Sequence, residues 1–375
     1  MSVVGSAPQN VPRFVTLGLI PLANLAAAFI ISGLVVVIVG DDPLQALEVM
    51  LYGAFGSAES WGFTLYYATN FVFTGLAVAI AFHCGLFNIG GEGQAMLGGL
   101  GVGLVCLGFD DWPFVVVFPL AIVACALFGA AWAFVPGYLQ AKRGSHVVIT
   151  TIMFNFLASA LMTYLLVEVL IAPGQQSPES REFAPGAWLP YMHDMLRAIG
   201  ISMPETPLNL AFVVALAASV FVYYFVWRTR WGYEIRTVGQ NETAAVYAGI
   251  SPSKNIILAM AISGALAGFV GLNEIMGVQH RLILDFSGGY GFVGIAVALM
   301  GRNHPVGIAL SALLFGALYQ GGTELAFEMD KITREMVVVI QGFVILFAGA
   351  LEHMFRPQLE SLFTRRSNAA APAGE

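Results

Sequence analysis

The chain has 375 residues, of which 58% are hydrophobic and only 10% charged, and its mean hydropathy is +0.79. These values exclude an ordinary soluble domain and predict an all-α polytopic membrane protein. The formal net charge of −7 says little about partners, because in a membrane protein the side on which each charge lies matters more than the total.

Ten apolar stretches are candidates for membrane-spanning helices. They lie near 14–39, 61–83, 94–109, 113–137, 147–172, 208–227, 256–278, 290–300, 306–327 and 336–354, and the third and eighth are short. With the N-terminus inside, eleven of the sixteen Lys and Arg residues fall on the cytoplasmic side, which predicts that both termini are cytoplasmic. If one short stretch is re-entrant, the sides after it are inverted.

This topology divides the chain into a cytoplasmic N-terminus (1–13), a transmembrane domain (14–354) and a partly disordered cytoplasmic tail (355–375). Within the domain, residues 173–207 contain six prolines and are predicted to form an extracytoplasmic loop with little regular structure. That loop is a candidate surface for a partner.

Residues 41–60 have no Lys or Arg and carry apolar residues at helical spacing, namely Leu44, Leu47, Met50 and Leu51. The pattern predicts an amphipathic segment on the outer face, and the alternative is a plain connecting loop.

A charged stretch, residues 228–255, is predicted to form a short helix, a turn and the start of a second helix, on the cytoplasmic side. Asn241 suits an N-cap position and Gly249 suits the residue after a helix end, while Ser251 followed by proline restarts a helix. Small side chains gather on one face, at Ala244, Ala245 and Ala248. The stretch is therefore predicted to be a surface that a partner protein grips.

Two glycine-rich segments follow the second and seventh apolar stretches. They read F-N-I-G-G-E-G-Q-A-M-L-G-G from Phe87 and F-S-G-G-Y-G-F-V-G from Phe286. The preceding spans run in opposite directions in this topology, so spans two to five and seven to ten are predicted to be inverted repeats. Broken helices at matching positions of two repeats indicate a transport site.

Five polar residues at membrane depth are predicted to line a substrate path or its gate: Asn88, Glu92, Gln94, Asn155 and Glu274. A charged side chain at this depth costs roughly 2.5 to 3.5 kcal/mol, and Asn and Gln offer the donors and acceptors that a polyhydroxyl compound or a nucleobase needs. The alternative is that these residues tie helices together or cap broken ones. Asn24 and Asn70 are expected to do only that.

The sequence contains no motif that indicates catalysis by this chain itself. None of the three lysines ends a phosphate-binding loop, and no Ser/His/Asp or paired-carboxylate arrangement is readable. Cys84, Cys106 and Cys125 lie in apolar stretches without metal-ligand spacing, so packed thiols are expected. The sequence predicts no enzyme activity, no metal and no cofactor bound by this chain.

Four motifs in order carry a family resemblance: G-L-F-N-I-G-G-E-G-Q from Gly85, V-I-T-T-I-M-F-N from Val148, R-T-V-G-Q-N-E-T-A-A-V-Y-A-G-I from Arg236 and G-Y-G-F-V-G-I-A-V-A-L-M-G-R-N-H-P from Gly289. The chain resembles the permease subunits of bacterial ABC importers of the branched-chain amino acid, ribose and nucleoside group. The likeness is greatest to the larger permease of simple-sugar and nucleoside systems.

The resemblance implies a ten-helix permease of the vitamin-B12-importer type (type II) with two inverted-repeat halves, in the bacterial inner membrane. The implied partners are a cytoplasmic ATPase that binds ATP, a second permease, an extracytoplasmic substrate-binding protein and membrane lipid, without nucleic acid. The cargo expected by analogy is a nucleoside or a simple sugar. Coupling to the ATPase is assigned to residues of the 228–255 stretch: Arg236, Gly239, Asn241, Ala244, Ala245 and Gly249.

A rival interpretation of the broken helices is a secondary transporter of a small polar solute, driven by an ion gradient. Such a transporter needs a carboxylate within the membrane, for which Glu92, Glu168 and Glu274 are the candidates. It leaves the capped cytoplasmic stretch unexplained.

Overall fold

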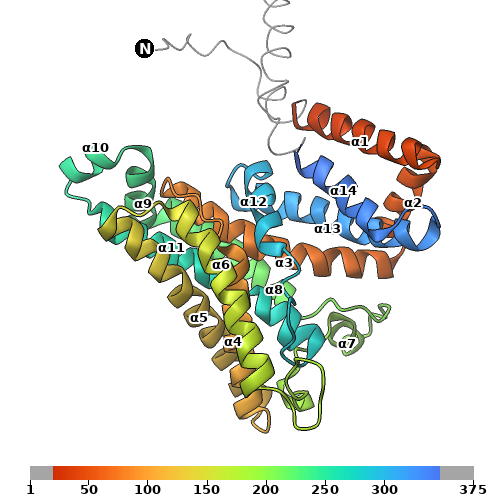
Figure 1. Cartoon of the computed structure of the whole chain (residues 1–375), viewed down its shortest axis with the longest axis horizontal. Coiled ribbons are helices and arrows are strands. Elements are labelled where there is room, and N and C mark those ends of the chain that lie inside the picture. Colours follow the sequence, from red (N-terminus) through yellow and green to blue (C-terminus); the bar gives the residue numbers. More distant parts are fainter. Residues whose placement is uncertain (1–19, 347–375) are drawn as a thin grey trace, which may run out of the picture. The chain divides into compact units, whose positions relative to one another are not determined.

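The computed structural model describes residues 20–346, so the predicted terminal segments 1–13 and 355–375 lie outside the described residues. All regular elements in the described range are helical, accompanied by two isolated β-bridges. The described residues form two compact units, 20–50 with 322–346, and 51–321. Figure 1 shows the elements coloured by sequence. They are α1 (Ile20–Val39), α2 (Pro43–Phe55), α3 (Ala58–His83), α4 (Gly91–Phe109), α5 (Phe114–Arg143), α6 (Val147–Tyr164), η2 (Leu165–Val169), η3 (Pro185–Ala187), α7 (Met192–Arg197), α8 (Ala211–Arg228), α9 (Arg230–Gln240), α10 (Glu242–Tyr247), α11 (Pro252–Gly268), η4 (Leu272–Gln279), α12 (Tyr290–Met300), α13 (Pro305–Glu328) and α14 (Arg334–Ile345).

Seven helices of the described range are long and apolar enough to cross a membrane: α3, α4, α5, α6 with η2, α8, α11 with η4, and α13. The count becomes eight if α1 and α2, which are bent by 117° at a short break, form one span. All ten predicted stretches contain a helix, but α12 has only 11 residues and the described α14 only 12. The described residues thus confirm an all-helical polytopic chain and leave the number ten as a prediction.

The smaller unit contains α1, the first two turns of α2, α14 and the last turns of α13, around a core that includes Val36, Ala46, Leu325 and Ile340. Lys331 Nζ donates hydrogen bonds to the carbonyl oxygen of Gly40 at 2.7 Å and to Asp41 Oδ1 at 3.0 Å. It thereby fixes the break between α1 and α2.

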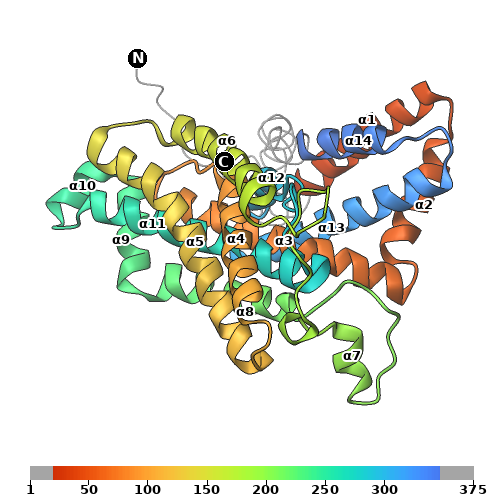
Figure 2. The ribbon, with the colours of Figure 1, turned by 60° about the horizontal axis from the view of Figure 1, so that its bottom comes forward.

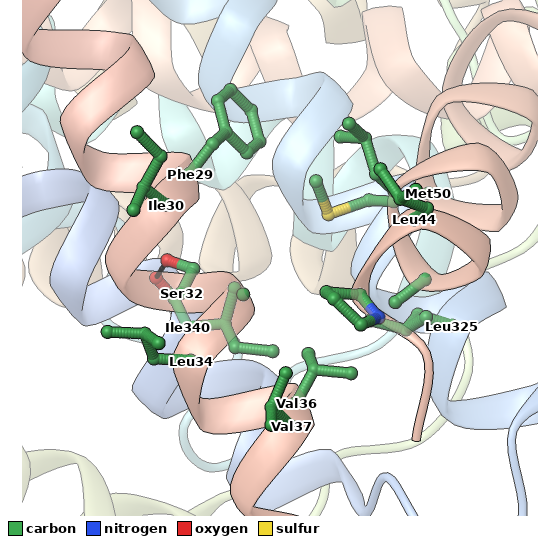
Figure 3. Close-up of a pocket in the computed structure, with 14 residues that line it drawn as sticks. Phe29, Ile30, Ser32, Leu34, Val36, Val37, Leu44, Met50, Leu325 and Ile340 are labelled. Atoms are coloured by element: carbon green, nitrogen blue, oxygen red, sulfur yellow. Dashed lines mark hydrogen bonds between the residues drawn. The ribbon is translucent and has the colours of Figure 1, made fainter.

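An apolar pocket of about 330 Å³ lies between these helices (Figure 3). Its polar lining side chain is Ser32, which donates a hydrogen bond to the carbonyl oxygen of Ile340 at 3.5 Å. Residues 41–60 include α2, as the helical spacing predicted, with Met50 buried and Leu44 exposed.

The larger unit is organised around α3, α4 and α11, whose side chains are mostly buried. Helix α11 packs along α5 and α3, and α4 packs along α5 (Figures 1 and 2). A Cβ atom on Gly98 would lie 2.2 Å from Gly268 Cα, and one on Gly129 would lie 2.2 Å from the carbonyl oxygen of Gly264. Such backbone contact is typical of membrane helices, where packing rather than apolar burial drives association.

Helices α5, α6 and α8 form the outer part of this unit and expose large apolar side chains, such as Val115, Phe156 and Val220. In water such a surface would be unfavourable, whereas lipid tails solvate it at no cost. Several buried polar residues lie on the inner elements α3, α4 and η4, among them Asn70, Glu92 and Glu274.

Candidate functional site

Asn88 and Gln94 form a reciprocal amide pair in the first glycine-rich break, between α3 and α4. Asn88 Nδ2 donates to Gln94 Oε1 at 2.9 Å, and Gln94 Nε2 donates back to Asn88 Oδ1 at 3.1 Å. Asn88 also donates to Ser263 Oγ on α11 at 2.9 Å, and its Oδ1 accepts from the backbone N–H of Gly90 at 2.9 Å. Both side chains are buried, so this pair fixes the path of the break.

Asn155 holds the same break from α6. Its Oδ1 accepts from the backbone N–H of Gly93 at 2.9 Å, and its Nδ2 donates to the carbonyl oxygen of Ile89 at 2.9 Å. These two bonds satisfy backbone groups on either side of the helix start, which have no partner within α4. The structure therefore brings Asn88, Gln94 and Asn155 together around one segment.

Glu92 joins the first break to the second. It lies in the first turn of α4, and its Oε1 accepts from Ser287 Oγ at 2.6 Å and from the N–H of Gly289 at 2.9 Å. Its Oε2 accepts from the N–H of Gly291 at 2.9 Å. Gly289 and Gly291 begin α12, so the carboxylate caps the start of a helix, where the helix dipole favours an anion.

The two breaks also touch through their backbones. A Cβ atom on Gly291 would lie 2.2 Å from the backbone nitrogen of Glu92, and one on Gly91 would lie 3.3 Å from the carbonyl oxygen of Gly291. Helix α12 packs on α3, and α4 packs on α11, so each helix that follows a break contacts the helix that precedes the other break. The two motifs that the sequence singled out are one structural site.

Glu274 belongs to a separate buried network. It lies in the π-helical segment η4, and its Oε1 accepts from the Tyr66 hydroxyl at 2.7 Å and from Asn70 Nδ2 at 2.6 Å, both on α3. Asn273 extends the network by donating to Asn70 Oδ1 at 3.0 Å. The expectation that Asn70 ties helices together is confirmed, because Asn70 of α3 bonds to both Asn273 and Glu274 of η4.

Beside this network lies a group of four tyrosines that the sequence analysis missed, which we call the tyrosine cluster: Tyr66, Tyr67, Tyr290 and Tyr319. They come from α3, α12 and α13. The available signal was the polar run Y-Y-A-T-N within an apolar span, which places Tyr66 and Asn70 four residues apart on one helix face.

The 228–255 stretch forms α9, α10 and the start of α11 at one end of the larger unit (Figures 1 and 2). The predicted caps are confirmed at both ends of α10. Asn241 Oδ1 accepts from the N–H of Ala244 at 2.9 Å, and Gly249, with φ +77°, closes the helix. The N–H of Gly249 donates to the carbonyl oxygen of Val246, and the N–H of Ile250 donates to the carbonyl oxygen of Ala245. These two hydrogen bonds form a Schellman motif. Ser251 precedes α11, but its hydroxyl makes no capping hydrogen bond.

The predicted small-residue face of α10 is wrong at one position. Ala244 and Ala248 are exposed, whereas Ala245 is fully buried because it faces the rest of the chain. A large residue at position 245 would therefore disrupt packing inside this chain and would not test a partner contact. The exposed surface here also carries aromatic side chains, with Tyr247 88% exposed and Trp231 61% exposed.

Gly239 is a packing residue of α9. A Cβ atom there would lie 2.3 Å from the carbonyl oxygen of His83 and 2.8 Å from the backbone nitrogen of Gly85, at the end of α3. Arg236, one turn earlier, is half-buried, and its Nε is buried without a hydrogen-bond partner among the described residues. Helix α9 thus lies directly on the residues that begin the first break.

Residues 173–207 are folded against the larger unit, with η3 and α7 as their short helices. Arg181 donates to Asp110 Oδ2 at 2.6 Å and to the carbonyl oxygen of Leu107 at 2.7 Å, which caps the end of α4. The Arg181 guanidinium holds the pKa of the Asp110 carboxyl below its usual range. Trp188 stacks on His280 with ring centroids 4.0 Å apart, so the segment is anchored at several points.

Metal-ligating clusters of three or more His, Cys, Asp or Glu are absent from residues 20–346. The three cysteines are buried and free. What the described site offers chemically is therefore hydrogen bonding and aromatic surface inside a helical bundle.

Comparison with known proteins identifies the family. The family model described as branched-chain amino acid transport system / permease component matches residues 61–349. The glucose ABC transporter permease protein TsgB13 of Haloferax volcanii is 34% identical over 96% of this chain and 94% of its own length. The guanosine ABC transporter permease protein NupP of Bacillus subtilis is 34% identical over 88% of this chain and 93% of its own. The nucleoside ABC transporter permease protein NupB of Lactococcus lactis is 32% identical over 88% of this chain and 90% of its own.

No solved structure matches the chain. The family match covers most of the chain and includes both glycine-rich breaks and the α9–α10 stretch, which confirms the resemblance that the four motifs carry. The chain belongs to the family of permease components of branched-chain amino acid transport systems.

Proposed function

We propose that this chain is the permease subunit of an ATP-driven importer and forms the membrane path for a nucleoside. The observation that carries this proposal is the meeting of the two glycine-rich breaks, where Glu92 of α4 caps α12 inside a buried helical bundle. Discontinuous helices joined at one place are where transporters of known repeat architecture bind their cargo. The reciprocal packing of α12 on α3 and of α4 on α11 supports two inverted-repeat halves.

The finer architecture is proposed as ten spans of the vitamin-B12-importer type, in the bacterial inner membrane with both termini cytoplasmic. This counts α1 with α2, α12 and the region of α14 as three spans in addition to the seven helices that are long enough by themselves. Asn88, Gln94, Asn155 and Glu92 would then shape the break that opens and closes, and Glu274 would lie beside it.

The energy source is proposed to be a separate ATPase subunit, because the chain has no phosphate-binding loop. Its docking element would be α10, Asn241 to Gly249, where Ala244 and Tyr247 are exposed. Arg236 and Gly239 of α9 would pass the movement of α10 to the end of α3, against which Gly239 packs. A second permease and an extracytoplasmic binding protein complete the proposed importer.

A simple sugar is the second candidate cargo, since the relative from Haloferax volcanii is named for glucose. Two other relatives are named for guanosine or nucleosides, and the aromatic surface beside Glu274 suits a nucleobase. We therefore place nucleosides first.

The test is ATP-driven uptake by the complete importer in proteoliposomes, with labelled guanosine, uridine and glucose offered separately. We expect nucleoside uptake that requires ATP and the ATPase subunit and that persists when ionophores collapse ion gradients. Uptake of glucose and of neither nucleoside would show that the cargo is a simple sugar instead. Uptake that needs an ion gradient and no ATPase subunit would support the secondary transporter instead.

A further inference from the structure

We propose that the tyrosine cluster and Glu274 form the surface that the cargo contacts during passage, with the base stacked on tyrosine rings and a base N–H donating to Glu274 Oε2. This inference rests on the proposed function and specifies where, and by which chemistry, a nucleoside is recognised within the membrane.

The four tyrosines form a continuous aromatic wall. Ring centroids are 5.0 Å apart for Tyr66 and Tyr67, 5.7 Å for Tyr67 and Tyr319, and 6.2 Å for Tyr319 and Tyr290. Phe71 contacts the wall edge-on, with ring centroids 5.5 Å from Tyr290 and 5.0 Å from Tyr319. Aromatic rings held in this way offer π-faces, on which any base can stack.

The wall has an inner and an outer part. Tyr66 and Tyr290 are buried, whereas Tyr67 and Tyr319 are half-buried and keep part of their surface accessible. Tyr290 directly follows Gly289, whose N–H binds Glu92. The wall is therefore linked along the backbone to the place where the two breaks meet.

The carboxylate of Glu274 is not explained by its role within the chain. Both hydrogen bonds that it accepts from described residues arrive at Oε1, from Tyr66 and Asn70. None of the salt bridges among residues 20–346 involves Glu274, although its side chain is buried. A glutamine would accept the same two bonds at lower desolvation cost, so the second oxygen, Oε2, points to a donor that the described residues do not supply.

A nucleobase supplies both a donor for Glu274 Oε2 and a flat ring that can stack on the tyrosines. Guanine, hypoxanthine and uracil each carry a ring N–H donor in the plane of an aromatic ring that can stack. A hexose offers hydroxyl donors but no flat π-system, so it would use Glu274 without the rings. The π-helical backbone at residues 272–279, a form of helix found often at functional positions, is consistent with a site that exchanges partners.

The decisive variant is Glu274→Gln, because it keeps the acceptor for Tyr66 and Asn70 and removes the acceptor at Oε2. In the complete reconstituted importer, with binding protein saturated by guanosine, we expect uptake to fall about tenfold. Assembly with the ATPase subunit should remain unchanged. If Oε2 has no cargo role, Glu274→Gln will transport guanosine as well as the wild type, which would overturn the proposal.

The rings are tested at the half-buried Tyr319. We expect Tyr319→Leu to reduce guanosine uptake about tenfold and Tyr319→Phe to retain it, because stacking requires the ring and not the hydroxyl. Tyr164→Leu is the matched control, since Tyr164 is an exposed tyrosine on the outer helix α6. Equal guanosine uptake by Tyr319→Leu and by the control would refute stacking on the tyrosine rings. It would leave the proposed function intact, because the wild type would still transport the nucleoside. Absence of nucleoside uptake by the wild type would instead refute the proposed function.

Discussion

Glu92 shows how a hydroxyl and backbone N–H groups accommodate a carboxylate within an apolar bundle. Its two oxygens accept three hydrogen bonds from one hydroxyl and two backbone N–H groups. Because the N–H groups begin α12, the partial positive charge of a helix start faces the carboxylate. The residue thus supplies to the second break what a Ser or Asp N-cap supplies to an ordinary helix.

Replacing Glu92 by Gln should therefore destabilise the protein. One of the oxygens becomes an NH₂ group that faces an N–H donor, so one bond is lost and the charge-to-dipole attraction disappears. We expect a loss of about 2 kcal/mol in the free energy of unfolding, measured by denaturant titration in detergent micelles.

Glu59→Gln is the matched control for this change. Glu59 also lies in the first turn of a helix, α3, but is exposed, so the expected change is below about 0.5 kcal/mol. Equal unfolding curves for Glu92→Gln and the control would mean that the cap contributes nothing to stability.

At the scale of elements, the local signals were predictable and the contacts between elements were not. Asn241 and Gly249 were found because caps depend on residues within one turn. Ala245 was assigned to the wrong face, because its burial is decided by the packing of α10 on the rest of the unit. Asn88 and Glu92 were recognised by their depth in the membrane, yet their partners Ser263 and Ser287 come from distant parts of the chain.

The contact of α9 with the end of α3 gives a test of how movement reaches the first break. In Gly239→Ala the new methyl group would lie 2.3 Å from a backbone oxygen, so α9 must shift away from His83 and Gly85. We expect ATP hydrolysis to continue while guanosine uptake per ATP hydrolysed falls several-fold. Both quantities are measured in the same proteoliposomes.

Gly108→Ala provides the comparison within the chain, since a Cβ atom at Gly108 meets nothing within 4 Å. This substitution should leave the transport-to-hydrolysis ratio unchanged. If Gly239→Ala also keeps the wild-type ratio, the α9 contact is not part of the coupling route.

For the whole molecule, hydropathy located the helices and left their number open. Long apolar stretches such as the one that forms α5 are unambiguous because length and composition suffice. The short α12 was predicted, because the eighth apolar stretch is itself short, whereas the sharp bend between α1 and α2 was not readable, since it depends on packing against helices elsewhere in the chain. The same reason explains why the tyrosine cluster was missed.

The side of the membrane on which each surface lies can be checked with thiol labelling. The three native cysteines are buried, so they give little background with a membrane-impermeant maleimide. Single cysteines at two exposed positions, Tyr247→Cys in α10 and Ile199→Cys after α7, are separated by α8 alone among the span candidates.

We expect Tyr247→Cys to react in inverted membrane vesicles and Ile199→Cys to react in intact cells. If both cysteines react from the same side, α8 does not cross the membrane. If each reacts from the side opposite to the one expected, the orientation of the chain in the membrane is the reverse of the predicted one.

The glycine contacts between α4, α5 and α11 carry a consequence for how such a permease diversifies. At Gly98 and Gly129 even one added methyl group would collide with a neighbouring backbone, so these positions cannot drift by small steps. The scaffold is thereby insulated from selection for a new cargo. Adaptation has to proceed at other positions, and the half-buried Tyr67 and Tyr319 are among them.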